Sequence, residues 1–280
     1  MAACLSWEGT ATAQPGDSDR REIGRTTERE LKVVISSTFG HVKISRCEPE
    51  KIVLAEADPG EKSPMKISYS IRNRIGYLEI TLGEQSNEEH EHGVFRVNNI
   101  ESGAWTLRFG TAIPISFDIE QAVGKGEYDL SGLQVKDFTL SSGASDVVLT
   151  FNEPNTTVID NLSIESGVSK FSGHRLGNAN FKRFRFQGGV GSSTLDFSGD
   201  LRSEVDVDIE LGFGALTLVV PPETGAQVFY DEGWMSRIDY DRDFSKDGES
   251  RYSTNNYSTA RGKMNIRIDA GLGRVKLRRP

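Results

Sequence analysis

The stretch Ile209-Glu-Leu-Gly-Phe-Gly-Ala-Leu-Thr-Leu218 contains the pattern from which most of this chain is built. Before its Gly-Phe-Gly centre, apolar residues occupy every second position back to Val205, and after it they do so again at Leu216 and Leu218. Alternation with a period of two is typical of a half-buried β-strand. Glycine accepts backbone angles that other residues resist, so the centre predicts a tight corner between two short strands.

Similar windows recur along the chain, and their spacing indicates the fold. They open at Ile35, Ile71, Ile119, Leu140, Ile164, Phe186, Ile209 and Ile268. Subtraction of the positions from 119 to 209 gives successive offsets of 21, 24, 22 and 23 residues. A period in this range is the signature of stacked repeats. We therefore predict an all-β chain that forms a single-stranded β-solenoid, a rack of stacked β-turns with repeats of about 21–24 residues and a terminal cap. A generic antiparallel sheet is the alternative.

Each corner is expected to carry one apolar residue that points inward and stacks along the axis. The expected apolar corner residues are Phe39, Ile75, Val123, Val168, Val190, Phe213 and Leu272. The corner glycines are Gly143, Gly167, Gly189, Gly212 and Gly271. Three windows replace this glycine, with Thr38, Arg74 and Ala122, and match the pattern more loosely.

The composition fits a narrow core. Hydrophobic residues make up 36% of the 280 residues, which is low for a globular domain but sufficient for stacked repeats. The net charge of −8 argues against binding to nucleic acids or anionic membranes, which need a basic surface. Two cysteines, Cys4 and Cys47, cannot form a disulfide framework. No apolar run reaches the length of a transmembrane helix.

The N-terminal sequence carries a trace of export. Ala11-Thr-Ala13 before Gln14 has the small residues of a signal-peptidase site, and Cys4 has the setting of a lipid-anchored cysteine. The charged and apolar regions that should precede either site are missing, which indicates a clipped or misassigned start. We predict an extracytoplasmic location, in the periplasm or at the cell surface, with a lipid anchor at Cys4 left open. A disordered cytosolic tail is the alternative.

Changes in pattern divide the chain into three parts. Residues 1–29 are expected to be an export-signal remnant and a disordered linker, residues 30–94 N-terminal β repeats, and residues 95–280 the β-solenoid. A long insertion, residues 226–262, interrupts the last part before its closing strands. Its aromatic residues Trp234, Tyr240, Tyr252 and Tyr257 form either a terminal cap or a binding surface, and the cap is favoured.

Two short clusters have side chains that could hold a metal ion. His90 and His92 stand two apart in an acidic segment, without a third ligand at a defined spacing. Asp239, Asp241 and Asp243 resemble a calcium loop but lack its glycine and distal glutamate. A solvated loop and an acidic surface are the favoured interpretations, so no metal site and no cofactor is predicted.

A row of charges is expected to pair across neighbouring strands. Acidic residues alternate along the strand that begins the Ile209 unit, and basic residues occupy the preceding unit. The rows are Glu204, Asp206, Asp208 and Glu210, and Lys182, Arg183 and Arg185. No catalytic signature is found: there is no Gly-x-Ser-x-Gly elbow, no His-Glu-x-x-His and no phosphate-binding loop.

Three runs resemble a known family. The run from Ile115 to Leu133 is similar to the N-terminal module of bacterial toast-rack proteins. Residues 209–222 and 264–277 are similar to its C-terminal part, which is itself similar to cell-wall-active antibiotic response proteins and to domains labelled "putative adhesin". The resemblance covers about residues 95–280. It implies a β-rack outside the cytoplasm and defines no catalytic residue.

The sequence therefore predicts a non-enzymatic, extracytoplasmic interaction module, in envelope-stress sensing or adhesion. Its partner would be an envelope protein or a glycan, and a homo-oligomer is left open. One alternative is a carbohydrate-active enzyme of the polysaccharide-lyase type, since stacked β-coils also host such sites. Another is a structural protein that self-assembles through exposed strand edges.

Overall fold

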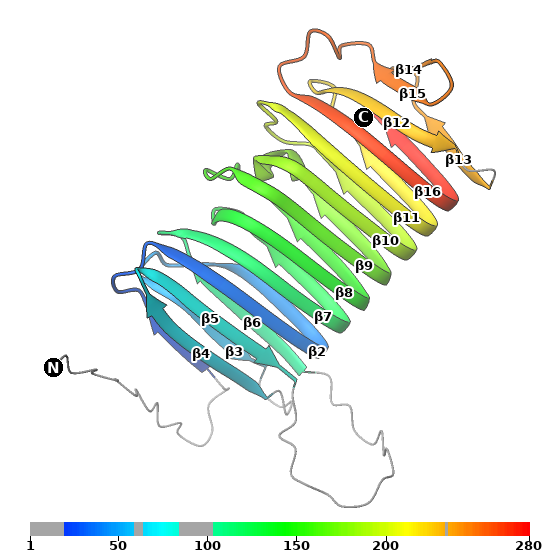
Figure 1. Ribbon diagram of the computed structural model, residues 1–280. Coiled ribbons are helices and arrows are strands. Elements are labelled where there is room, and N and C mark those ends of the chain that lie inside the picture. Colours follow the sequence, from blue (N-terminus) through cyan, green and yellow to red (C-terminus); the bar gives the residue numbers. More distant parts are fainter. Residues whose placement is uncertain (1–19, 59–63, 84–102, 233–234) are drawn as a thin grey trace, which may run out of the picture.

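The computed structural model describes residues 20–58, 64–83, 103–232 and 235–280. Within these ranges the chain forms a rack of long parallel strands that follow one another along one axis (Figure 1). Each long strand is a rung of the rack. The inner rungs are β7 (Pro114–Asp129), β8 (Gln134–Thr150), β9 (Ile159–His174), β10 (Phe181–Asp196) and β11 (Glu204–Val219).

The register of the rungs reproduces the repeat of the sequence. Ile119 lies opposite Leu140, which lies opposite Ile164. The same row continues through Phe186 to Ile209. Each rung therefore pairs with the equivalent positions of the next, and the predicted β-solenoid with its period of 21–24 residues is confirmed.

Every inner rung bends at its middle, and its two halves face each other across one core. In β11, Val207 and Ile209 before the bend and Leu216 after it are buried. The ring of Phe171, after the bend of β9, packs against that of Phe186, before the bend of β10, with centroids 5.2 Å apart. The halves before the bend form the first-half sheet, and the halves after it form the second-half sheet.

At the N-terminal end of the rack, the outermost full rung pairs with two separate shorter strands along its outer edge. β2 (Glu30–Cys47) runs parallel to β7. On its other edge it pairs with β5 (Ile75–Leu82) along its first half and with β6 (Gly103–Gly110) along its second half. Antiparallel strands complete this end: β4 (Met65–Arg72) beside β5, β3 (Lys51–Ala57) beside β6, and β1 (Arg20–Gly24) beside β3.

The C-terminal end repeats this arrangement. The last rung, β16 (Lys263–Arg278), inserts between β11 and two shorter parallel strands, β12 (Gly225–Glu232) and β13 (Ser236–Tyr240). A hairpin of β14 (Phe244–Asp247) and β15 (Arg251–Thr254) then pairs with β12. Phe244 and Tyr252 of this hairpin are buried. The described part of the insertion 226–262 therefore contains four short strands, and it caps the open end of the stack (Figure 1).

Two expectations for the N-terminal region are wrong. The window at Ile71 is not a rung, because Asn73 and Arg74 take left-handed φ angles of 53° and 62° and form the turn of the β4–β5 hairpin. Ile75 therefore begins a strand and is not a corner residue. The linker predicted through residue 29 is also wrong for Arg20–Gly24, which pair with β3 as strand β1.

Helix is nearly absent from the described ranges. Its only example there is the 3-10 turn η1 (Leu176–Ala179), between β9 and β10. None of the helical structure in these ranges is long and apolar enough to cross a membrane.

Candidate interaction surface

An apolar row runs along the corner of the rack from β2 to β16, and its residues on β7 to β11 are exposed. Each rung contributes one residue, and neighbours in the row lie opposite each other in the strand register. The row, here the corner ridge, consists of Phe39, Val123, Ala144, Val168, Val190, Phe213 and Leu272. Val168 is 63% exposed and Phe213 57% exposed. A continuous exposed apolar row is a candidate surface for contact with another molecule.

The prediction that the corner residues point inward is wrong for Val123, Val168, Val190 and Phe213, which are 39–63% exposed, whereas Phe39 and Leu272 are half-buried. Strict alternation from Ile209 would place Phe213 in the core, but two consecutive residues, Gly212 and Phe213, face outward at the bend. The alternation resumes one position out of phase, so that Leu216 is buried next. The bend therefore turns the predicted inner row into an outer one, while the stack of rungs remains as predicted.

The corner glycines are required mainly because neighbouring rungs approach closely. A Cβ on Gly212 would lie 2.7 Å from the carbonyl oxygen of Gly189 in the preceding rung. The same contact would be 2.4–2.9 Å at the other predicted corner glycines, Gly143, Gly167, Gly189 and Gly271. Gly214, just past the bend, also has a φ of +146°, which side-chain-bearing residues rarely adopt. Next to the ridge, the backbones of neighbouring rungs are therefore too close for any residue with a side chain at these glycine positions.

A polar row lies beside the ridge on the first-half sheet. It occupies the second position of each window and includes four carboxylates in register. This carboxylate row consists of Glu120, Ser141, Glu165, Gln187, Glu210 and Asp269. A groove of about 940 Å³ is lined by this row and by the corner glycines. It is open along its length and follows the axis of the rack.

The first two carboxylates of this row are not used by the fold. Within the described ranges, Glu120 and Glu165 make no side-chain hydrogen bond or ion pair. Glu210 accepts a hydrogen bond of 2.8 Å from Gln187 Nε2 and lies 3.9 Å from an Arg185 nitrogen. Neutral Ser141 and Gln187 separate the first three acids, which limits repulsion between like charges across strands.

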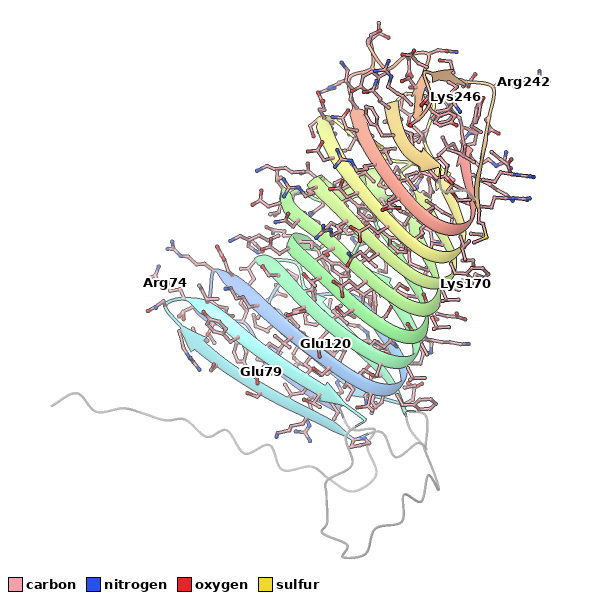
Figure 2. The ribbon with its side chains drawn as sticks, turned by 45° about the vertical axis from the view of Figure 1, so that its right-hand side comes forward. Arg74, Glu79, Glu120, Lys170, Arg242 and Lys246 are labelled. Atoms are coloured by element: carbon pink, nitrogen blue, oxygen red, sulfur yellow. The ribbon has the colours of Figure 1, made fainter. Side chains whose placement is uncertain are left out.

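The second-half sheet borders the ridge with both signs of charge. Lys125, Asp146 and Lys170 occupy one register position past the bend. A groove of about 610 Å³ lies between this row and the ridge. Figure 2 labels Glu120 before the bend and Lys170 after it, on the two sides of the corner. The ridge is therefore bordered by negative charge on one side and by mixed charge on the other.

A buried polar contact lies inside the corner of β7. Tyr128 donates a hydrogen bond of 2.7 Å to Gln121 Oε1, and Gln121 Nε2 donates one of 2.8 Å to the carbonyl of Lys125. Burial raises the pKa of Tyr128, so the phenol stays protonated. These contacts connect the two halves of the rung beneath the exposed corner.

The three aspartates among the candidate metal ligands each contact an arginine side chain. Asp241 pairs with Arg278 at 2.7 Å, and Asp239 lies 3.5 Å from an arginine of the same rung, Arg274. Asp243 lies 3.7 Å from Arg279. Each of the three aspartates therefore contacts one arginine near the C-terminus. No group of three or more metal-ligating side chains occurs in the described ranges. His90, His92, Cys4 and Trp234 lie outside those ranges.

The predicted charge rows lie side by side. Arg183 is opposite Asp206, and Arg185 is opposite Asp208. Lys182 instead contacts Asp160 of the preceding rung, at 2.7 Å. Sequence reasoning noted these rows but missed the carboxylate row beside the corner. Its signal was present, because the second residue of every true rung window is polar.

Comparisons with known proteins give one family match and several similar solved structures. A family model described as "N-terminal domain of toast_rack, DUF2154" matches residues 12–172 and 154–219. No curated protein sequence gives a significant match. Two of the similar solved structures are a "putative cell adhesion protein" from Clostridium sporogenes and a "putative adhesin" from Bacteroides fragilis. The first is 17% identical with a TM-score of 0.45, over 94% of this chain and 99% of that one. The second is 12% identical with a TM-score of 0.39, over 94% and 98%.

Proposed function

Because this chain belongs to the toast-rack family, whose model matches more than half of it, we propose that its β-solenoid serves as a non-enzymatic interaction module outside the cytoplasm. Its role would be adhesion, and its partner an extended segment of an envelope or surface protein that carries basic side chains. The extracytoplasmic part of the proposal rests on the export pattern at Ala11–Ala13.

The corner ridge is the observation that carries this proposal. Phe213 and Val168 remain more than half exposed although the chain has a core in which to bury them. Exposed apolar side chains in a continuous row stabilise a complex when a partner covers them. The carboxylate row beside the ridge would select a partner of opposite charge.

The spacing of the carboxylates fits an extended peptide. Glu120 and Glu165 are two rungs apart, which corresponds to about 9.6 Å for strands 4.7–4.9 Å apart. A polyproline II segment repeats every three residues, or about 9.3 Å. A basic residue at every third position would therefore meet Glu120, Glu165 and then Glu210 along the groove.

Binding of a designed peptide tests the proposal. A fluorescent peptide of repeated Lys-Pro-Pro is titrated with the full chain at low salt and followed by anisotropy, with repeated Glu-Pro-Pro as its charge-reversed control. We expect saturable binding of the lysine peptide alone, weakened by added salt because the attraction is electrostatic. The double variant Glu120→Gln/Glu165→Gln should bind at least about five-fold more weakly.

Matched variants separate the corner from the rest of the surface. Asp160→Asn removes an exposed carboxylate outside the groove and should leave binding unchanged. Val148→Ser removes an exposed valine from the second-half sheet, and Val168→Ser removes one from the ridge. Equal binding by these two valine variants would rule out the ridge as the contact. Failure of the lysine peptide to bind at all would overturn the proposal.

A further inference from the structure

A second recessed area lies on the outer face of the first-half sheet, nearer the starts of the rungs than the corner. It has a volume of about 670 Å³, within the range of small-ligand sites. Two rows of side chains, two residues apart along the strands, form it. The first row is Asn161, Arg183, Asp206 and Asn265, and the second is Ser163, Arg185, Asp208, Arg267 and Phe229.

The charge of this hollow differs in sign from that of the chain. Three arginines and two aspartates line it, a balance of one positive charge, whereas the whole chain carries −8. The arginines come from two different rungs, β10 and β16, with an acidic rung between them. An anionic group would therefore find a local basic site on an acidic protein.

The guanidinium groups in the hollow are only loosely paired. The closest carboxylate contact of Arg185 is 3.9 Å, to Glu210, and that of Arg267 is 4.0 Å, to Asp208. Both exceed the 2.7–3.2 Å of a hydrogen bond. Arg183 makes no ion pair or side-chain hydrogen bond within the described ranges. By contrast, Lys182 reaches Asp160 at 2.7 Å on the same face. The guanidinium N–H groups of these three arginines are thus available to donate hydrogen bonds to a ligand.

One aromatic ring stands at the end of the hollow. Phe229 of β12 is 42% exposed and lies opposite Arg267 in the register. An exposed phenyl face beside charged groups suits a ligand with one apolar face and polar edges. A pyranose ring has this character, because its C–H groups form one face and its hydroxyls lie at the edge.

We propose that this hollow binds an acidic saccharide, a glycan whose sugar rings carry carboxylates. The planar guanidinium of Arg183 or Arg267 would bind a sugar carboxylate in a bidentate manner. Asp206 and Asp208 would accept hydrogen bonds from sugar hydroxyls, and a ring would pack on Phe229. The two aspartates favour this ligand over a phosphodiester polymer, which offers them negative charge and few donors.

Calorimetric titration with trigalacturonate tests the site, with the methyl ester of the same trimer as control. The ester keeps the rings and hydroxyls but removes the charge. We expect saturable binding of the acid, and binding of the ester at least ten-fold weaker. The double variant Arg183→Gln/Arg267→Gln should also weaken binding of the acid at least ten-fold. Lys182→Gln, which removes an exposed positive charge outside the hollow, should bind normally. All these side chains are exposed, and thermal unfolding verifies that each variant is folded.

Three results would overturn the inference. These are no binding of the acid, equal binding of acid and ester, or unaltered binding by the arginine variant. Phe229→Ala separates a saccharide site from a simple anion site: it should weaken trimer binding several-fold and leave any effect of inorganic sulfate unchanged. A Phe229→Ala variant that binds the trimer as the wild type does would contradict the saccharide assignment.

The outcome is independent of the corner ridge. The lysine peptide should bind the Arg183→Gln/Arg267→Gln variant as it binds the wild type, so either proposal can fail alone. The same incubations show whether the trimer is cleaved. Cleavage that depends on the arginines would support the saccharide site and would contradict the non-enzymatic role.

Discussion

The two long edges of the rack differ in which side chains they bury and which they expose. The corner edge exposes valines and one phenylalanine, with Val190 at 46% and Phe213 at 57%. The opposite edge, where turns return the chain from one rung to the next, buries asparagines: Asn155 is 5% exposed and Asn178 is 6% exposed. The difference shows that hydrogen bonding and backbone packing decide the place of a side chain here as much as its polarity does.

Asn155 explains how the return edge tolerates buried polar groups. The two N–H groups of its amide are shared among the carbonyls of Val135, Thr157 and Ala179, which lie 2.7–3.1 Å from the nitrogen, and its Oδ1 accepts from the Val135 N–H at 3.0 Å. A buried amide with all these partners costs little and connects successive turns. Asn178 has a similar role one turn later, bonded to Phe151 and Asp200. The buried amides of the return edge thus have hydrogen-bond partners within the chain, whereas the corner edge keeps apolar side chains exposed to solvent.

The largest effect on stability is expected when a corner glycine is replaced by alanine. In Gly214→Ala the new Cβ would meet the carbonyl oxygen of Gly191 at 1.8 Å, at a φ of +146°. Either the rungs separate or the backbone changes its angle, and we expect a loss of about 4 kcal/mol in the free energy of unfolding. Urea unfolding followed by circular dichroism measures the loss.

Gly24→Ala is the matched control for this change. A Cβ on Gly24 would meet no atom within 4 Å beyond its own chain neighbours, and Gly24 has no positive φ. Its substitution should therefore cost less than about 0.5 kcal/mol. If both alanine variants proved equally stable, close packing of the rungs at the corner would be refuted.

The next largest effect is expected at the return edge. Asn155→Ala removes the partner of the Val135 N–H, which is left buried without an acceptor, and frees three carbonyls. We expect a loss of about 3 kcal/mol in the free energy of unfolding. Asn152→Ala, an exposed asparagine in the same turn, should change it by less than about 0.5 kcal/mol. Equal losses for the two variants would show that the buried amide does not hold the turns together.

The sequence predicted the stack of rungs but not which way its corner residues face. The period and the alternation depend on local pattern, which is visible in one chain. The phase change at the bend was also visible: buried positions are odd at Val205 and Ile209 and even at Leu216 and Leu218. If the odd-numbered series of buried residues is extended past Ile209, it places Phe213 inside the core, and this extension is the error in the prediction.

Other features could not be derived from local pattern. The insertion of β16 between β11 and β12 depends on long-range pairing, and the sequence indicated only that a cap was needed. The carboxylate row and the hollow arise when single residues from several rungs come into register. Each residue alone resembles an ordinary exposed charge, so only the stack reveals that they share a surface.

A smaller effect is expected from the ridge itself. Phe213→Ser removes a side chain that is 57% exposed, and we expect it to lower the free energy of unfolding by less than about 1 kcal/mol. Phe184→Ala, in the core of the neighbouring rung, should cost about 3–5 kcal/mol. The same Phe213 variant should lose affinity for the lysine peptide. Stability that falls as far in Phe213→Ser as in Phe184→Ala would mean that the ridge is part of the core.

The smallest effect is expected from acid at the C-terminal end of the return edge. The Arg279 N–H, at 2.9 Å, and then the Arg278 side chain hold the pKa of Asp241 below its usual value. A depressed folded-state pKa contributes stability above the unfolded value of about 3.9, and this stability is lost as pH falls through the folded value. The carboxylate is 33% exposed, so the contribution should stay below about 1 kcal/mol. Unfolding of wild type and Asp241→Asn should therefore differ near neutral pH and converge in acid. A difference between them that persisted in acid would assign the effect to packing and not to the charge of Asp241.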